Sequence, residues 1–195
     1  GNENSIFGVE NDIKDSSMNL ISGYKNEILA NTSSFINGET NVVESNIDSL
    51  ITGKGNIVKN NHQVFVQGLE NDVSGNSKNA IIVGKQNKIF DGEQNAIFGE
   101  YQKIHSSINN FITGMTNESM HDINSVLFGN SNKTRAVVDS LVLGEANFIE
   151  TSQCSTITGQ LNTVRNTSTS IVSGYGNIQN YTESSTIFGE DNDIS

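Results

Sequence analysis

The apolar and polar positions of this chain recur with a period of fifteen residues. Each period contains a glycine that follows a short apolar run, and eleven of the twelve intervals between these glycines are fifteen residues long. The exception is the interval of sixteen residues between Gly68 and Gly84. The thirteen glycines are Gly8, Gly23, Gly38, Gly53, Gly68, Gly84, Gly99, Gly114, Gly129, Gly144, Gly159, Gly174 and Gly189. Thirteen copies in phase predict one solenoid domain over residues 1–195.

Four further positions of the period are strongly biased. Two residues before the glycine stands Ile, Val or Leu in every copy, and three residues after it stands Asn in all copies but one, where Gln102 replaces it. Five residues after the glycine Ile or Val dominates, and four residues before it Ser or Asn holds eleven of thirteen places. Because side chains alternate across a strand, the consensus S-x-I-x-G-x-x-N-x-I predicts two short strands per coil with both named residues facing inward.

These residue types favour a coiled β fold over a helical repeat. Fifteen residues are too few for two helices and a turn, and Gly, Ser, Asn, Ile and Thr are weak helix formers. An asparagine amide has both donors and acceptors, so a column of stacked asparagines can satisfy itself without water. The pattern therefore predicts an all-β solenoid of 13 coils of about 15 residues, with polar ladders at its corners.

The outward positions differ between the two expected strands. Four residues after the glycine, eight of thirteen residues are charged, which predicts a solvated face. Three residues before the glycine, ten of thirteen are apolar, which predicts a permanent interface with other copies of the chain. The predicted interface residues are Leu20, Phe35, Leu50, Phe65, Ile81, Phe111, Val126, Leu141 and Ile171, and Ala96 is the tenth apolar residue. The alternative is that a different register makes this column the core of the coil itself.

The composition limits the classes of partner. The net charge of -11 with only 11 Lys and Arg argues against nucleic acid and against an anionic membrane, and favours a cationic or neutral partner. The one cysteine, Cys154, permits no internal disulfide, and we expect it to be a buried small residue. No stretch has the length of an apolar membrane span, and the first residues lack the layout of a signal peptide. Direct membrane insertion of this chain is therefore not expected, and targeting or anchoring parts would lie outside it.

The sequence predicts no catalytic, cofactor or metal site. The three histidines, His62, His105 and His121, fall at different positions of the period and form no evident cluster. Left-handed helix acyltransferases also consist of coils, but their repeat is a hexapeptide, and no period of six runs through this chain. We therefore expect the chain not to be an enzyme.

The repeat resembles the head repeat of bacterial trimeric autotransporter adhesins of the YadA-like class, whose consensus is close to S-V-A-I-G-x-x-S-x-A. The resemblance spans the whole chain and implies a homotrimer of left-handed parallel β-rolls, held outside the outer membrane by a stalk and a barrel that are not in this sequence. It further implies a virulence-associated head that adheres to a host surface glycoprotein or matrix protein. The Asn-, Ile- and Ser-rich composition resembles coding from AT-rich genomes such as fusobacterial ones, and some fusobacterial adhesins of this family bind carcinoembryonic-antigen-related cell adhesion molecules on host cells. Bulky Ile replaces the family's Ala, and Asn its Ser, so binding residues are not carried over.

The candidate partner contacts come from the residues alone. Exposed apolar residues six after the glycine, with their neighbours, predict one adhesive patch, which consists of Phe90, Tyr101, His105, Met115, Met120 and Arg135. Leu29 with Val42 and Ile57 is a second candidate, and the inserted residue within 74–79 marks a third. Two alternatives stay open: that these are ordinary surface hydrophobes, and that the chain is a ligand-free trimeric spacer or a phage-type fibre segment.

Overall fold

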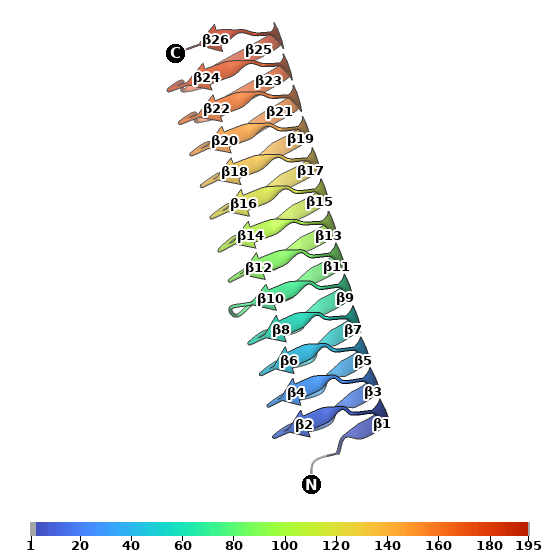
Figure 1. The fold of residues 1–195 in the computed structure, drawn as a ribbon. Helices are drawn as coiled ribbons and strands as arrows, with labels where there is room; N and C mark the ends of the chain where they lie inside the picture. The colour runs from blue at the N-terminus through green and yellow to red at the C-terminus, as the bar shows by residue number, and fades with distance from the viewer. Residues whose placement is uncertain (1–2, 195) are drawn as a thin grey trace. The chain divides into compact units, whose positions relative to one another are not determined.

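The computed structural model describes residues 3–194 as a parallel β-solenoid of thirteen turns, without a helix in that range. Each turn contributes one strand to each of two parallel sheets (Figure 1). The all-β parallel fold predicted from the period is thereby confirmed. The chain falls into two compact units, residues 1–101 (unit 1) and residues 102–195 (unit 2). The prediction of one domain over 1–195 stays a prediction, and residues 1, 2 and 195 lie outside the described part.

Unit 1 contains the first thirteen strands. The odd-numbered strands, which contain the repeat glycines, are β1 (Ser5–Val9), β3 (Leu20–Tyr24), β5 (Phe35–Glu39), β7 (Leu50–Lys54), β9 (Phe65–Leu69), β11 (Ile81–Lys85) and β13 (Ala96–Glu100). The even-numbered strands are β2 (Asp12–Lys14), β4 (Glu27–Leu29), β6 (Val42–Glu44), β8 (Ile57–Lys59), β10 (Asp72–Ser74) and β12 (Lys88–Phe90). Odd strands pair with odd strands and even with even, so equivalent residues of successive turns lie side by side.

Unit 2 repeats this arrangement. Its even strands are β14 (Lys103–His105), β16 (Glu118–Met120), β18 (Lys133–Arg135), β20 (Phe148–Glu150), β22 (Thr163–Arg165), β24 (Ile178–Asn180) and β26 (Asp193–Ile194). Its odd strands are β15 (Phe111–Met115), β17 (Val126–Asn130), β19 (Leu141–Glu145), β21 (Ser155–Gln160), β23 (Thr169–Tyr175) and β25 (Ser184–Glu190). The even strands are short, because each consists of one inward-facing residue and the residue on either side of it before the chain turns again.

The repeat glycine is required by the close stacking of turns. Gly38 has φ +134°, which L side chains rarely adopt, and a Cβ built on it would lie 1.8 Å from the carbonyl oxygen of Gly53 in the next turn. That oxygen accepts a hydrogen bond from Asn41 Nδ2 at 2.9 Å. The glycine and asparagine columns are therefore coupled, since the amide reaches the carbonyl that a side chain would displace.

Within the asparagine ladder, each interior asparagine such as Asn41 can use all of its side-chain donors and acceptors. Asn41 Nδ2 donates to Asn26 Oδ1 at 2.9 Å as well as to the glycine carbonyl, and Asn41 Oδ1 accepts from the backbone N–H of Asn56 at 3.1 Å and from Asn56 Nδ2 at 2.9 Å. Both donors and both acceptor sites are used, and the side chain is fully buried. The predicted self-satisfying ladder is confirmed, and Gln102 continues it by accepting from the backbone N–H of Asn117 at 3.0 Å.

The coil has a third side that the two-strand prediction missed. Between each even strand and the next odd strand, single residues of successive turns form parallel bridges, such as Ile47 with His62 and Ile123 with Val138. The residue before each bridge faces inward, eight positions after the glycine in turns of fifteen residues. In unit 1 this third column contains an amide ladder, in which the Asn46 backbone N–H donates to Asn31 Oδ1 at 2.7 Å.

Two inward columns, two residues before the glycine and five residues after it, form the apolar part of the interior, and among the described residues only three members of these columns are polar. The residues two before the glycine are fully buried in most turns, as predicted, while Ile6 in the first turn is half exposed. Five residues after the glycine, Ser119, Thr134 and Gln179 replace Ile or Val and are nevertheless buried. All three belong to unit 2, whose apolar columns therefore contain more polar residues than those of unit 1.

The expectation that Cys154 is buried is wrong. It lies at a turn before β21 with φ +50°, and it is exposed. Its position ten after the glycine is a left-handed turn position in most coils, and its side chain points away from the interior. Within residues 3–194 the structure contains no helix with the length and hydropathy needed to cross a membrane.

Candidate binding surfaces

The residues three before the glycine lie on the outer face of the odd strands, which we call the apolar column. In unit 1 Leu20, Phe35 and Leu50 pair in register, and Phe65 and Ile81 continue the series. In unit 2 the series is Phe111, Val126, Leu141 and, beyond Thr156, Ile171. Their exposed fractions reach 44% at Ile81 in unit 1 and 45% at Ile171 in unit 2. The register alternative is therefore wrong, because the residues two before the glycine form the core and this column faces outward.

The apolar column has an aromatic neighbour that the sequence interpretation did not use. The residue immediately before each glycine also faces outward, and in unit 2 Phe128 at this position contacts Phe111, with ring centroids 5.4 Å apart. Apolar residues recur at this position in both units, for example Val83 and Leu143. The outward alternation could have revealed them, but four of the first five copies have a polar residue at this position, and these residues mask the signal.

The structure brings together only part of the predicted adhesive patch. His105, Met120 and Arg135 are the last residues of β14, β16 and β18 and lie in register on the outer face of the even strands of unit 2. Met115 ends β15 and therefore belongs to the other sheet of unit 2. Phe90, at the end of β12, and Tyr101, in a left-handed turn, are exposed residues of unit 1. The patch as predicted thus divides between sheets and between units.

The histidines are less scattered than their positions in the period suggest. His105 and His121 lie in neighbouring turns and pack edge to face, with ring centroids 5.3 Å apart. Neither is joined by the third ligand that a metal site requires, since the described residues hold no group of three His, Cys, Asp or Glu side chains suited to a metal. His62 is separate and lies in the third-side ladder of unit 1.

A buried carboxyl group lies beside this histidine pair. Asp122 occupies the third column, where its Oδ2 accepts hydrogen bonds from the hydroxyls of Ser119, at 2.7 Å, and Thr134, and its Oδ1 accepts from the backbone N–H of Val137 at 2.9 Å. Burial raises the pKa of Asp122, although these hydrogen bonds and the nearby His121 oppose the increase. Ser119 and Thr134 are two of the three polar residues that replace Ile or Val in the core of unit 2. These two replacements therefore supply the hydrogen-bond donors for the buried carboxyl group of Asp122.

The inserted residue forms the third predicted candidate. Gly75 and Asn76 both have positive φ and lengthen the turn after β10, which projects beyond its neighbours (Figure 1). Beside it lies a shallow hollow of about 280 Å³ lined by Ile47, His62 and Lys78 among others. The second candidate also forms a group, because Val42 and Ile57 pair in register and Leu29 lies one turn away.

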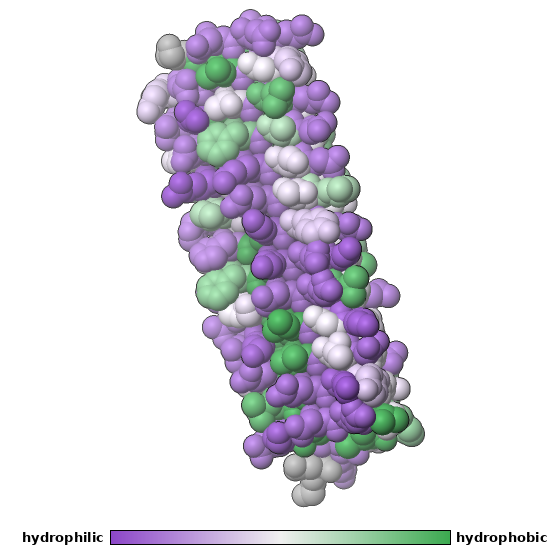
Figure 2. Space-filling view, in the orientation of Figure 1, coloured by the Kyte–Doolittle hydropathy of each residue, from purple (hydrophilic) through white to green (hydrophobic). Residues whose placement is uncertain are grey.

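Figure 2 shows one face of the molecule, on which apolar residues lie in small groups between hydrophilic ones.

No protein-family model matches the chain, and no curated protein matches it. Among solved structures, the chain is similar to a UDP-N-acetylglucosamine O-acyltransferase (LpxA) from Moraxella catarrhalis, with 10% identity and a TM-score of 0.25 over 87% of this chain and 66% of that one, just under two thirds of its length. It is also similar to the polySia-specific acetyltransferase NeuO, with 11% identity and a TM-score of 0.21 over 80% of this chain and 72% of that one.

Both likenesses are weak. Both of these similar structures are acyltransferases, which contradicts the expectation that the chain is not an enzyme. The exclusion of catalysis is therefore withdrawn.

Proposed function

We propose that the chain is the head of a bacterial cell-surface adhesin of the trimeric autotransporter class, which associates with two further copies through the apolar column and holds a host surface glycoprotein or matrix component on its even strands. The observation that carries the proposal is the apolar column itself. A solenoid core is complete without these side chains, yet they recur outward in register through unit 1 and again through unit 2.

The free energy of burial favours self-association. A large aliphatic or aromatic side chain that passes from full exposure to full burial contributes about 1.5 to 3 kcal/mol. The nine column residues are at most 45% exposed in the single chain, so each contributes about half of this value or less when sister copies cover it. The total is of the same order as the roughly 4 to 15 kcal/mol that association costs in lost freedom. In this proposal the coils are left-handed and the head lies outside the outer membrane, as the resemblance implies.

The even strands are the surface left free in such an assembly. In unit 2 their outer face contains His105, Met120 and Arg135, and in unit 1 it contains the Leu29, Val42 and Ile57 group. Both combine apolar side chains with polar neighbours, which is typical of binding surfaces. The carcinoembryonic-antigen-related cell adhesion molecules are one host glycoprotein class that we propose to test.

Light scattering on the purified chain tests the assembly. We expect a mass about three times the 21.1 kDa of one chain. Replacement of Phe35, Leu50 and Phe65 by Gln should give a folded single chain, because it removes three adjacent rungs of the column. The matched control replaces Leu29, Ile57 and Phe90 by Gln on the even strands of the same unit and should leave the mass unchanged. A wild-type chain that is folded and monomeric would overturn the proposal.

Attachment to host cells tests the binding role. We expect the associated chain to attach, and Phe90→Ser with Met120→Ser to reduce attachment without changing the mass. A chain that associates but attaches to no host surface would instead support a ligand-free spacer or fibre segment, and the adhesin proposal would fail.

A further inference from the structure

The charges of unit 2 are sorted by face. Residues 102–195 contain four Lys and Arg and nine Asp and Glu, a net charge of 4 - 9 = -5. All four cations occupy outward positions of the even strands, namely Lys103 on β14, Lys133 and Arg135 on β18, and Arg165 on β22. The same strands from β14 to β22 present only two acids outward, Glu118 and Glu150. This surface, which we call the basic strip, therefore has a net charge of 4 - 2 = +2 on an acidic unit.

The ion pairs within the basic strip leave cationic groups in excess. Lys133 pairs with Glu118 at 3.1 Å, and Glu150 is shared between Arg135 at 3.7 Å and Arg165 at 3.9 Å. Lys103 lies beside Glu118 in the ladder but makes no ion pair among the described residues. The side chains of Arg135 and Arg165 are 58% and 49% exposed. Exposed ion pairs contribute little, at most about 1 kcal/mol, so an anionic ligand can replace these carboxylates at low cost.

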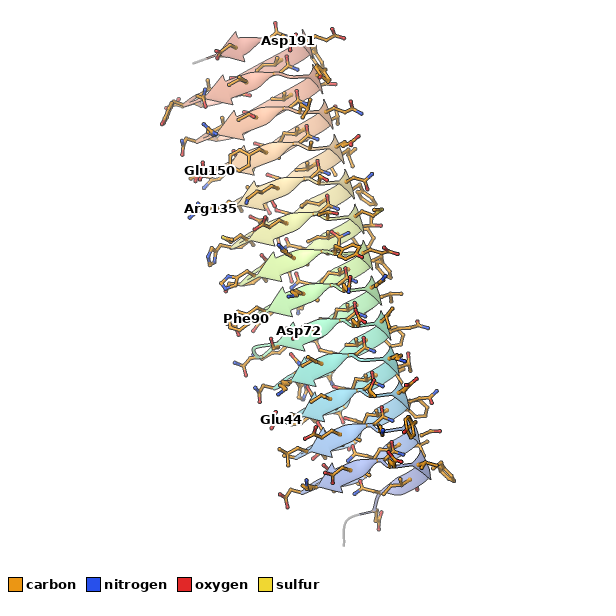
Figure 3. All side chains as sticks on the ribbon, in the orientation of Figure 1. Glu44, Asp72, Phe90, Arg135, Glu150 and Asp191 are labelled. Atoms are coloured by element: carbon orange, nitrogen blue, oxygen red, sulfur yellow. The ribbon has the colours of Figure 1, made fainter. Side chains whose placement is uncertain are left out.

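The cations recur at every second turn along straight columns. Lys103 and Lys133 are two turns apart in one column, and Arg135 and Arg165 are two turns apart in the other, with a glutamate in the turn between. With about 4.8 Å between strands, each interval is about 9.6 Å. Figure 3 shows Arg135 and Glu150 at the ends of neighbouring strands with their side chains directed away from the interior.

This spacing discriminates between classes of anionic partner. Duplex DNA has one charge per roughly 1.7 Å, so its phosphates would face the glutamates as well as the cations. An extended acidic peptide repeats its side chains on one face every 6.6 to 6.8 Å or so, out of phase with the strip. A linear sulfated polysaccharide repeats each kind of anionic group at disaccharide intervals, and its sugar hydroxyl groups can donate hydrogen bonds to the glutamate carboxylates between the cations.

The side chains of the basic strip suit such a polymer. A guanidinium group binds a sulfate through two parallel N–H···O hydrogen bonds. The Arg165 guanidinium lies over the Phe148 ring, 5.3 Å from its centroid, which holds the guanidinium in place and offers an apolar surface to a sugar ring. Met120, between His105 and Arg135 in the ladder, adds a second apolar contact. The strip follows the stacking direction of the turns, which suits a linear chain laid across several rungs.

We propose that the basic strip of unit 2 binds linear sulfated polysaccharides of the glycosaminoglycan type. The inference deepens the proposed binding role and rests on it for the physiological setting, while the contact itself depends only on the geometry of β14 to β22. It departs from the expectation of a cationic or neutral partner, because the local charge of the basic strip is opposite in sign to the net charge of -11.

Binding of the purified full chain to immobilised heparin tests the proposal. We expect binding that weakens with NaCl, and Arg135→Gln with Arg165→Gln should weaken it about tenfold or more and lower the slope of log affinity against log salt by roughly one to two. The matched control, Lys54→Gln with Lys85→Gln on the odd strands of unit 1, removes the same charge and should change the affinity less than about twofold. Glu118→Gln with Glu150→Gln should strengthen binding.

Four results would overturn the inference: no heparin binding by the wild type, equal losses in the arginine variant and its control, competition by desulfated heparin as effective as that by heparin, or equal competition by poly-glutamate or duplex DNA at matched charge. Circular dichroism confirms that each variant is folded. If heparin binding fails while the chain still attaches to host cells, only this inference is lost. If heparin binds but the chain attaches to no host surface, the proposed function is lost and the site remains.

Discussion

Units 1 and 2 share the same glycine and asparagine columns but differ in their interiors and in the placement of charge. Unit 1 has buried Ile or Val five residues after the glycine and an amide ladder of Asn31, Asn46 and Asn61 in the third column. In unit 2 the same positions include Ser119, Thr134 and the buried acid Asp122. The difference shows which positions the fold demands and which it tolerates, because whatever is invariant in both units is enforced by the stacking itself.

The charges differ in the same way. Unit 1 has seven lysines, which occur on both sheets and on the third side, and five of them pair with nearby acids. In unit 2 every cation lies on one sheet face. Surface charge has little effect on the fold, so this sorting points to binding, whereas the polar core of unit 2 bears on stability. In repeat proteins stability is a sum over turns and their interfaces, so the two units can be tested separately.

The largest effect is expected at the repeat glycines, where the units should respond alike. Gly38→Ala in unit 1 and Gly129→Ala in unit 2 each place a Cβ 1.8 or 1.9 Å from a backbone oxygen, so each should lower the free energy of unfolding by about 4 kcal/mol or more. Urea unfolding followed by circular dichroism measures the loss. The control Gly55→Asn lies at a left-handed position where other turns have non-glycine residues, and it should cost less than about 1 kcal/mol. A small loss of unfolding free energy in only one of the two alanine variants would contradict the expected equivalence of the units.

An intermediate effect is expected in the two polar columns. Asn41→Ala in unit 1 and Asn147→Ala in unit 2 remove a ladder amide and leave its buried partners unpaired, which should cost about 3 kcal/mol in either unit. Asn46→Ser, in the third column of unit 1, should cost only about 1 kcal/mol, because serine already occupies this column at Ser107 and Ser152. Shifts of the urea midpoint measure both. Equal losses in the two columns would contradict the view that only one of them is essential.

These columns also show how far the sequence predicts the structure. Positions fixed by stacking repeat in every turn, so the glycine, asparagine and inward Ile columns can be predicted from the sequence alone. The outward apolar column can be predicted as well, because its residue type recurs in most turns. The third side is not, because its inward site is small and accepts Asn, Ser, Asp, Gly, Val or Thr, which leaves no consensus. The basic strip is hidden for another reason. Its cations and glutamates alternate between turns, and the net charge of -11 conceals a local excess of opposite sign.

The smallest effect is expected at the buried acid, and it depends on pH. Burial raises the pKa of Asp122 in the folded chain above its value in the unfolded chain, so the folded state binds the proton more tightly. Its contribution is therefore most favourable in acid, and stability decreases as pH rises through the interval between the two pKa values. Asp122→Asn should raise the urea midpoint at neutral pH, by about 1 kcal/mol in stability, and remove this part of the pH dependence.

The reciprocal change sharpens the comparison. Asn46→Asp introduces a buried acid into unit 1, and the stability of that unit should then depend on pH in the same way. Amide hydrogen exchange at pH 5 and pH 8 measures this change in the local stability of unit 1. His121 lies beside Asp122 and opposes the increase in its pKa, so His121→Gln serves as the control for the imidazole. If Asp122→Asn leaves the pH profile unchanged, the buried carboxyl is not its source.

The sixteen-residue turn has a consequence for how such molecules diversify. On either side of Gly75 and Asn76 the ladders stay in register, with Phe65 beside Ile81 and Asp72 beside Lys88. The pairing of strands is thus indifferent to the length of this turn, and the extra residue projects outward at no cost to alignment. A foreign peptide grafted there would be displayed at a fixed height on a rigid scaffold, and an exchange of loops at this point would change the exposed surface without altering the framework beneath it.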